Sequence, residues 1–208
     1  MRLLFFGDSL TDMGRNRKPG MKYASSYGVG FVFHIASKLM SEEPGTYEII
    51  NRGIGGNKIT SLYRRYKNDV IKEEPDVVTI LVGVNDLFGK YRLPPGFGVT
   101  VERYKKIYIK MIEDIKNSLP NIKVILMEPF YLEGRLIKRY LKKFEELKEY
   151  SKAVEEVAKE THSEYIPLQE MFNNVGKDNP SNYLYDGLHT TPAGALLIAE
   201  KWLENFKK

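Results

Sequence analysis

Near the N-terminus, residues 2–12 read RLLFFGDSLTD, an apolar run that turns abruptly polar. The apolar part, Arg2–Gly7, lacks the alternation of apolar and polar side chains that marks a half-exposed strand. It is therefore typical of a parallel β-strand covered on both faces. The polar part begins where this run ends. The stretch predicts a buried strand that delivers Asp8 and Ser9 to the edge of a sheet.

Further apolar runs recur along the chain, separated by longer segments whose apolar residues follow the period of an amphipathic helix, about 3.6 residues. The clearest run, Asp76–Val82, is rich in valine, isoleucine and leucine. The last segment has Thr191 as a helix cap and Pro192 at the first helical position. The predicted strands are Arg2–Gly7, Tyr47–Asn51, Asp76–Val82, Asn121–Met127 and Glu164–Pro167, and the other predicted helices are Tyr27–Met40, Thr60–Glu74, Val101–Leu119 and Ile137–Glu160.

This alternation of strands and helices predicts an α/β fold with a parallel sheet and right-handed crossovers. Five strands in a chain of 208 residues favour a three-layer α/β/α sandwich, with residues 1–208 forming a single domain. Two long loops, Leu87–Thr100 with Pro94 and Pro95, and Pro129–Leu136, follow predicted strands. We expect both at the carboxyl edge of the sheet, where open α/β folds bind ligands.

The composition narrows the classes of function. The chain has no cysteine, which excludes disulfides, zinc–thiolate sites and a cysteine nucleophile. No apolar stretch approaches the roughly 20 residues of a membrane span, and the N-terminal apolar run is too short for a signal peptide, so we expect a cytoplasmic protein that binds no membrane. The formal net charge is +5, but lysines alternate with glutamates as on a solvated helix face, and we expect no nucleic-acid partner. The oligomeric state stays open, and a homo-oligomer is compatible with the sequence.

Ser9 and His189 are candidates for a nucleophile and its general base. His189 lies in a glycine-bearing loop before a helix, whereas His34 lies in an apolar helix and His162 in a polar turn. Asp186 precedes His189 by three residues and is placed to bind one ring nitrogen, leaving the other for Ser9. Taken singly, a serine after a strand is more often a turn or helix-cap residue, a lone histidine is usually structural, and Asp186 is as typical of a turn. The prediction therefore depends on their combination.

Gly56 and Asn85 are candidates for an oxyanion hole. A glycine lets its backbone N–H approach a substrate closely, and an asparagine amide can donate beside it. Taken singly, Gly53, Gly55 and Gly56 are more typical of a tight turn that needs positive φ, and Asn85 is more typical of a turn residue.

Four blocks nevertheless occur together: GDSL at 7–10, a glycine turn that includes Gly56, GVND at 83–86 and DGLH at 186–189. In this order they resemble the SGNH, or GDSL, hydrolase superfamily, and the resemblance spans nearly the whole chain. It implies a flavodoxin-like α/β/α fold and a carboxylic ester hydrolase that needs no metal and no cofactor. The implied roles are Ser9 as nucleophile, His189 as base, Asp186 as its orienting carboxylate, and the Ser9 amide, Gly56 and Asn85 as oxyanion donors.

The stretches GDSLTDMGRNR, INRGIGGNKI, MEPFYLEG and DGLHTTPAG are most similar to intracellular acetylxylan esterases of this superfamily, which remove acetyl groups from xylo-oligosaccharides. The resemblance implies a small acetylated carbohydrate as substrate. Position 185 departs from that group, because it is tyrosine here and tryptophan there. Aromatic residues near the predicted rim are the candidates for a substrate wall: Tyr91, Phe97, Phe130, Tyr131 and Tyr185.

Other functions are compatible with parts of the pattern. A broad short-chain esterase, a lysophospholipase or a thioesterase would use the same serine chemistry on other acyl groups. A non-catalytic flavodoxin-like binding module would need none of these residues. A metal-dependent phosphoesterase would use a carboxylate cluster, here Asp8, Asp12, Asp86 and Asp186.

Three polar residues near Ser9 have expected structural roles. We expect Asp8 and Asp12 to brace the turn at Ser9, and Arg52 to anchor the loop after the second strand.

Overall fold

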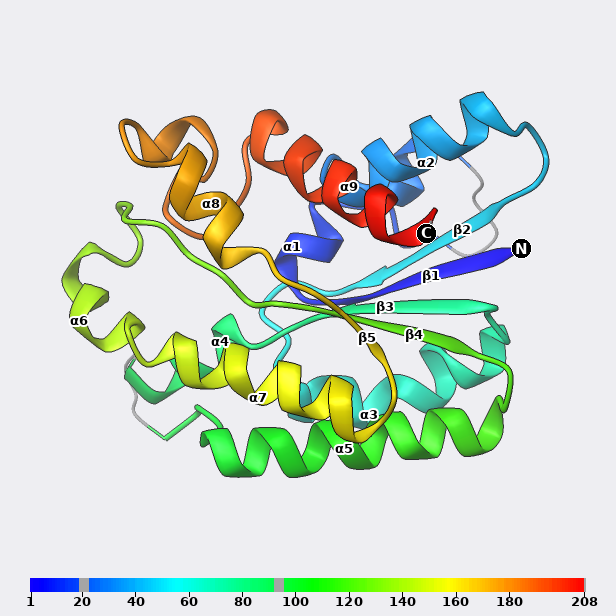
Figure 1. The fold of residues 1–208 in the computed structure, drawn as a ribbon, viewed down its shortest axis with the longest axis horizontal. Coiled ribbons are helices and arrows are strands. Elements are labelled where there is room, and N and C mark those ends of the chain that lie inside the picture. The colour runs from blue at the N-terminus through cyan, green and yellow to red at the C-terminus, as the bar shows by residue number, and fades with distance from the viewer. Residues whose placement is uncertain (19–22, 92–95, 208) are drawn as a thin grey trace.

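The computed structural model describes residues 1–18, 23–91 and 96–207, which form a five-stranded parallel sheet between two layers of helices (Figure 1). The strand order is β2-β1-β3-β4-β5, and each neighbouring pair is parallel. The predicted three-layer α/β/α fold is confirmed. The strands are β1 (Arg2–Gly7), β2 (Glu48–Gly53), β3 (Val77–Leu81), β4 (Lys123–Met127) and β5 (Glu164–Ile166).

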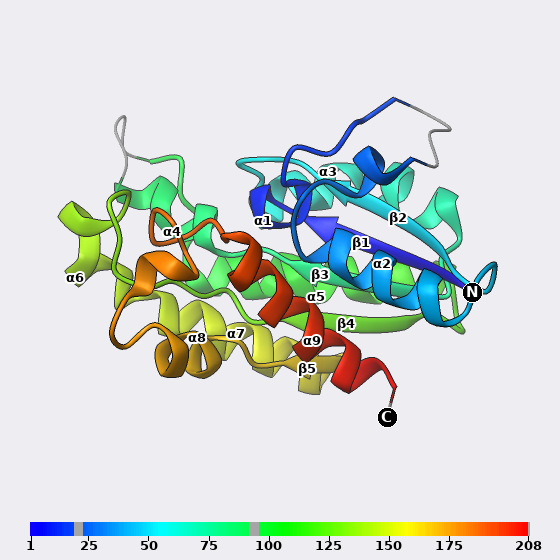
Figure 2. The ribbon, with the colours of Figure 1, turned by 90° about the horizontal axis from the view of Figure 1, so that it is seen from above.

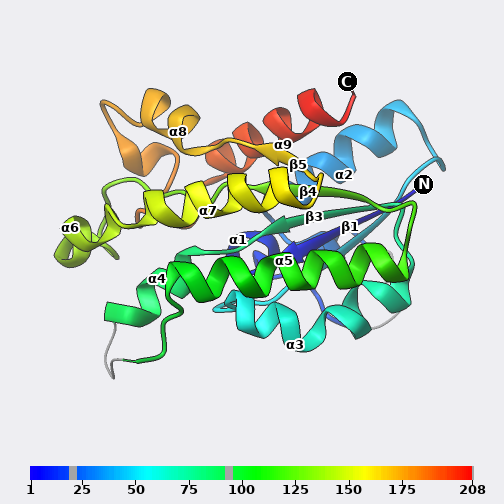
Figure 3. The same cartoon turned by 60° about the horizontal axis from the view of Figure 1, so that its bottom comes forward.

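Helices cover both faces of this sheet. Helices α2 and α9 pack against each other on one face (Figure 2), and α3, α5 and α7 lie side by side on the other (Figure 3). The α-helices are α1 (Ser9–Asp12), α2 (Phe31–Glu42), α3 (Ile59–Asp69), α4 (Val84–Tyr91), α5 (Val101–Ser118), α6 (Leu141–Phe144), α7 (Leu147–Glu160), α8 (Gln169–Val175) and α9 (Pro192–Phe206), and the 3₁₀ turns are η1 (Ala24–Tyr27), η2 (Ile71–Glu73), η3 (Lys138–Tyr140) and η4 (Pro180–Asn182).

Strand β1 shows why its sequence lacks alternation. Leu3 and Phe5 belong to the core beneath α2 and α9, whereas Leu4 and Phe6 belong to the core on the opposite face. All four side chains are at most 1% exposed. Successive residues of a strand point to opposite faces, so a strand covered on both sides needs apolar residues at every position.

The strand order also places the functional site. The chain leaves β1 toward β2 on one side and returns to form β3 on the other side of β1. The order therefore reverses at the carboxyl ends of β1 and β3, where Gly7 pairs with Leu81. Ligands of open α/β sheets bind at such a reversal. Ser9 follows β1 and Asn85 follows β3, so the topology brings these two predicted site residues to the same edge.

The predicted helix Thr60–Glu74 ends at Asp69 and is followed by η2, and the predicted helix Tyr27–Met40 begins only at Phe31. Two further predicted elements differ more strongly from the structure. The predicted helix Ile137–Glu160 is divided into η3, α6 and α7, because the chain bends toward α4, where Glu146 pairs with Lys90 and accepts a hydrogen bond from the Tyr91 hydroxyl. The predicted loop Leu87–Thr100 is wrong at its start, because α4 extends to Tyr91 with Leu87 fully buried. Pro94 and Pro95 of that loop lie outside the described residues.

The last helix is as predicted. The Thr191 side chain accepts a hydrogen bond from the Gly194 N–H at 3.2 Å, and Pro192 occupies the first turn. Farther along α9, Trp202 is fully buried, and its indole N–H donates to Thr79 Oγ1 of β3 at 2.9 Å. This hydrogen bond joins α9 to the centre of the sheet.

We expect Thr79→Val to lower the free energy of unfolding by about 1–3 kcal/mol, because valine keeps the shape but leaves the buried indole N–H without an acceptor. Thr79→Ser retains the hydroxyl and is the matched control. Urea denaturation of the two variants checks this, and equal midpoints for the valine and serine variants would show that the hydrogen bond contributes nothing.

Candidate active site

Ser9 is positioned by the short helix that follows β1. Asp8 caps this helix, since its Oδ1 accepts the Leu10 N–H at 3.0 Å. Ser9 is the first residue of the helix, and N–H groups in a first turn have no acceptor within the helix. Both the backbone N–H and the hydroxyl of Ser9 are thus available at the edge of the sheet.

His189 and Asp186 lie in a tight loop closed by an antiparallel bridge between Leu184 and Thr190. Within this loop, Asp186 Oδ1 accepts the backbone N–H groups of Leu188 at 2.9 Å and His189 at 2.8 Å. The carboxylate is therefore held by its own loop, while Oδ2 stays free to face the imidazole ring.

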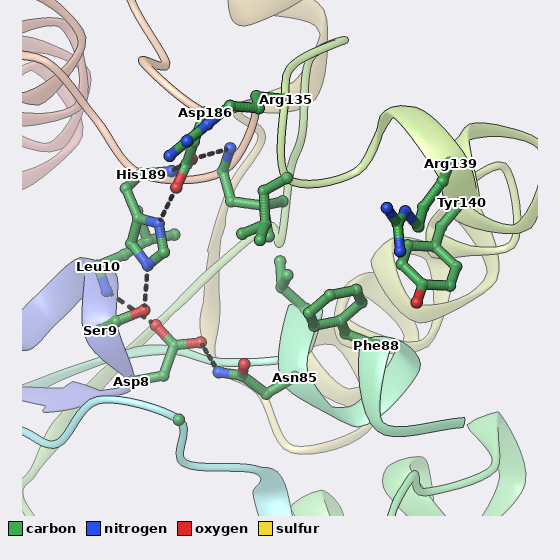
Figure 4. A pocket seen from close by; sticks show the side chains of 14 residues that line it. Asp8, Ser9, Leu10, Asn85, Phe88, Arg135, Arg139, Tyr140, Asp186 and His189 are labelled. Carbon is green, nitrogen blue, oxygen red and sulfur yellow. Dashed lines mark hydrogen bonds and ion pairs between the residues drawn. The ribbon is translucent and has the colours of Figure 1, made fainter. Parts of the chain in front are cut away.

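The structure brings the three predicted residues into one line of hydrogen bonds (Figure 4). Ser9 Oγ lies 3.0 Å from His189 Nε2, across 180 positions of sequence. His189 Nδ1 lies 2.7 Å from Asp186 Oδ2. An ionised carboxylate only accepts, so Nδ1 carries a proton, and Nε2 of the neutral ring can accept the Ser9 hydroxyl proton.

The pKa values of His189 and Asp186 shift in opposite directions. The hydrogen bond to Asp186 raises the pKa of His189 above its usual 6.5, although burial of the ring opposes this rise. Burial alone would raise the pKa of Asp186, but hydrogen bonds from the His189 ring and from two backbone N–H groups together hold it below its usual value. Asp186 is thus ionised near neutral pH and favours a proton on the adjacent ring.

Gly56 and Asn85 line the same cavity as Ser9 and His189. Gly56 has a φ of 77°, which favours glycine, as expected for the turn. Asn85 Nδ2 already donates to Asn57 O at 3.1 Å and, less closely, to Asp8 Oδ2 at 3.3 Å. Its amide is oriented by both contacts, and it can reach a substrate oxygen if the longer contact to Asp8 gives way.

Asp8 is the buried carboxylate of this cavity. Burial raises the pKa of Asp8 to about 6, against the opposing effects of the Leu10 N–H and the charge of His189. Asp8 is therefore mainly ionised at neutral pH, where it accepts from the Asn85 amide.

Side chains behind the site hold the glycine turn, residues 53–56, against α1. Asp12 Oδ2 accepts the Gly55 N–H at 3.0 Å, and a Cβ at Gly53 would lie 2.2 Å from the Asp12 backbone N, so only glycine fits there. Arg65 donates to Gly7 O at 3.0 Å and to Arg52 O at 2.8 Å. The predicted anchor, Arg52, instead directs its side chain to Glu73, so the anchoring role belongs to Arg65.

The cavity in front of Ser9 has a volume of about 560 Å³, within the range typical of small-molecule sites. Its apolar lining includes Leu10, Val84 and Leu188. Several other residues of the lining were not predicted from the sequence: Phe88 of α4, and Arg135, Leu136, Arg139 and Tyr140 of the segment before α6.

Residues 5–197 match the model of the GDSL-like lipase/acylhydrolase family. The chain belongs to this family. It is a carboxylic ester hydrolase, related to acetylxylan esterase.

Known relatives of this GDSL-like hydrolase are esterases. An acetylxylan esterase of Geobacillus stearothermophilus is 33% identical over 210 residues, which cover 97% of this chain and 92% of the relative. A crystal structure of Axe2, an acetylxylan esterase from the same organism, superposes with a TM-score of 0.86 at 32% identity and covers 98% and 92% of the two chains. Its catalytic mutants include replacements of a serine, an aspartate and a histidine by alanine. The isoamyl acetate-hydrolysing esterase of Saccharomyces cerevisiae is 24% identical over 98% of this chain and 84% of its own length.

Most of the aromatic residues expected to form a substrate wall in this GDSL-like hydrolase lie elsewhere. Phe130 is wrong, because it is fully buried and stacks on Phe172 with ring centroids 4.3 Å apart. Three more lie outside the cavity lining: Tyr91 bonds to Glu146, Phe97 contacts Lys58, and Tyr131 packs on Phe144.

Tyr185 is the exception among the five. Its ring stacks on His189 with centroids 5.9 Å apart and is 56% exposed. It borders a second, smaller cavity of about 270 Å³ that also touches Ser9.

The four aspartates of the alternative metal site serve separate partners. Asp186 bonds to His189, Asp8 to Leu10 and Asn85, and Asp12 to the Gly55 N–H and Arg17. Both oxygens of Asp86 accept the Ile59 N–H, and burial raises the pKa of Asp86 well above its usual value. In the part of the chain that the structure describes, no group of three or more histidine, aspartate or glutamate side chains is arranged to hold a metal ion.

Among the helices of residues 1–18, 23–91 and 96–207, none has the length and apolar character required to cross a bilayer.

Proposed function

We propose that this hydrolase is a serine esterase that removes acetyl groups from small acetylated carbohydrates, with xylo-oligosaccharides as the expected class. The observation that carries this proposal is the line of hydrogen bonds from Ser9 Oγ to His189 Nε2, at 3.0 Å, and from His189 Nδ1 to Asp186 Oδ2, at 2.7 Å. It opens onto a cavity of small-molecule size. The similarity to an acetylxylan esterase supports the acetyl group and the carbohydrate.

In the first half of the reaction, Ser9 Oγ attacks the ester carbonyl carbon while its proton passes to His189 Nε2. Asp186 keeps the ring oriented and stabilises its charged form. The carbonyl oxygen becomes negative and accepts hydrogen bonds from the Ser9 and Gly56 N–H groups and from the Asn85 amide.

The intermediate then breaks its bond to the sugar oxygen, and His189 returns the proton to that oxygen. The acetyl group remains on Ser9 as an ester. Water next attacks this acetyl carbon, again with His189 taking the proton, and acetate leaves while Ser9 regains its hydrogen.

We expect Asn85→Ala to lower kcat by on the order of 10²–10³, because one donor to the oxyanion is lost. The matched control is Asn117→Ala, because Asn117 is an exposed asparagine of α5 outside the cavity lining. Steady-state hydrolysis of 4-nitrophenyl acetate measures both. An Asn85→Ala variant with the wild-type kcat contradicts the oxyanion role.

We expect kcat/KM to fall as the pH drops through the pKa of His189, because only the neutral ring can take the Ser9 proton. The acidic limb should lie above pH 6.5, since the Asp186 hydrogen bond raises this pKa. The charge of Asp8 also raises the pKa of His189, so Asp8→Asn should shift the limb to lower pH. Rates measured from about pH 5 to about pH 9 check this, and a flat profile in both proteins contradicts a histidine base.

The test of the proposed function compares 4-nitrophenyl acetate, butyrate and octanoate, followed by acetylated xylo-oligosaccharides. Activity that is lost in Ser9→Ala, falls with acyl length and extends to the sugars supports the proposal. Preference for octanoate would keep the serine chemistry and indicate a lysophospholipase, and a preference for thioesters would indicate a thioesterase. An absence of hydrolysis would favour the non-catalytic binding module.

A further inference from the structure

Two arginines line the Ser9 cavity without a partner of their own. Arg135 and Arg139 are exposed, and neither has an ion pair or a hydrogen bond within residues 1–18, 23–91 and 96–207. By contrast, the arginines behind the site are bound: Arg17 to Asp12, and Arg65 to Asp69 and to backbone carbonyls. A guanidinium offers five N–H donors in a plane. A molecule that enters the cavity therefore meets two guanidinium groups whose donors are unoccupied.

Arg135 is held near the reacting residues by the backbone, and Arg139 lies on the other side of the cavity. Arg135 precedes Leu136, whose N–H donates to Asp186 O at 2.9 Å. Arg139 belongs to η3, next to Tyr140. Figure 4 shows Arg135 beside Asp186, and Arg139 with Tyr140 on the side of the cavity away from Ser9.

The carboxylates of the cavity do not neutralise these charges. Asp8 accepts from the Leu10 N–H and from Asn85, and Asp186 is bound by His189 and its own loop. The two carboxylates are therefore already hydrogen-bonded, and neither forms an ion pair with Arg135 or Arg139 in the part of the chain that the structure describes.

The same wall carries an aromatic pair. Phe88 and Tyr140 pack edge to face with centroids 5.5 Å apart, and both line the cavity. Rings of this kind pack against apolar surface, such as the C–H face of a sugar ring.

We propose that Arg135 and Arg139 bind an anionic group of the substrate, so that the preferred acetate esters are acidic carbohydrates. The inference rests on the proposed function and refines its substrate class. An oligosaccharide with a uronic acid supplies a carboxylate, and a sugar phosphate supplies a phosphate. Arginine binds both groups through two parallel N–H···O hydrogen bonds. The acetylated sugar would lie between Ser9 and the arginines, over Phe88 and Tyr140.

The experiment measures kcat and KM separately for four acetate esters. Two are neutral, 4-nitrophenyl acetate and an acetylated xylo-oligosaccharide. Two are anionic, the same oligosaccharide bearing a uronic acid and an acetylated sugar phosphate. We expect a lower KM for one or both anionic esters, and the better of the two identifies the source of the charge. This preference should weaken as salt is added, because partly exposed charges are screened.

The variant R135Q/R139Q removes both charges, and K138Q/K142Q is its matched control. Lys138 and Lys142 are exposed on the same segment but do not line the cavity, so the control makes the same change in net charge. We expect R135Q/R139Q to raise KM for the anionic esters on the order of ten-fold, since one exposed charge pair accounts for up to about five-fold. KM for the neutral esters should rise clearly less than KM for the anionic esters, and all values in the control should change less than about two-fold.

Two results would overturn the inference: equal KM for anionic and neutral oligosaccharides in the wild type, or an equal loss in the lysine control. The latter would assign the preference to overall charge. Failure of the proposed function looks different, because Ser9-dependent hydrolysis of 4-nitrophenyl acetate would then be missing. In that case, calorimetric titration of Ser9→Ala with the two oligosaccharides still decides the question, since selective binding of the acidic one supports the anion site and equal binding overturns it.

Discussion

Ser9→Ala is expected to lower kcat for 4-nitrophenyl acetate by on the order of 10⁴–10⁶. The variant has no hydroxyl to attack the ester, and His189 loses the group whose proton it accepts at 3.0 Å. Residues that act as a unit contribute together, so removal of one removes most of the rate enhancement.

The fold should survive this change, because the Asp8 cap that holds α1 is untouched. Circular dichroism and the thermal midpoint provide that check. Ser37→Ala is the matched control, since Ser37 lies exposed on α2 and bonds only to the Phe33 carbonyl of its own helix. Full activity in Ser37→Ala beside a loss in Ser9→Ala assigns the effect to the site. A Ser9→Ala enzyme that retains a tenth or more of the wild-type rate means that another group is the nucleophile.

Asp186→Asn should lower kcat by about 10⁴, a larger effect than the loss of an oxyanion donor. The amide can still accept the backbone N–H groups of Leu188 and His189 through its oxygen. Its NH₂ group, however, would donate to His189 Nδ1 and thereby place the ring proton on Nε2. In that tautomer the ring cannot accept the proton of Ser9.

The same substitution should lower the pKa of His189, because the Asp186 hydrogen bond is the main cause of its elevation. The acidic limb of kcat/KM should therefore shift to lower pH while the plateau falls. Asp178→Asn is the control, since Asp178 is an exposed aspartate outside the cavity lining. A loss of less than ten-fold, with an unshifted limb, would show that His189 does not depend on Asp186.

The sequence determined the layers of the fold, because a strand buried on both faces is visible in the sequence as an uninterrupted apolar run. Strand β1 and strand β3 are apolar at nearly every position, and this pattern needs no knowledge of their neighbours. It also determined the candidates for chemistry. Ser9, Asn85 and Asp186 each stand in a short motif after a strand or before a helix, and parallel strands bring such motifs to one edge.

Tertiary structure alone decided which side chains face the cavity. Phe130 and Arg135 lie on the same loop, yet Phe130 turns into the core against Phe172, and Arg135 turns into the cavity. Phe130 is apolar and Arg135 is charged, but the loop sequence does not show which of them borders the cavity, because that depends on what the rest of the chain places on either side. The bend that divides η3, α6 and α7 likewise depends on Glu146 meeting Lys90 and Tyr91 of α4. Strand burial and local motifs are encoded within a few residues, whereas the far wall of the cavity is made by contacts between segments that are distant in sequence.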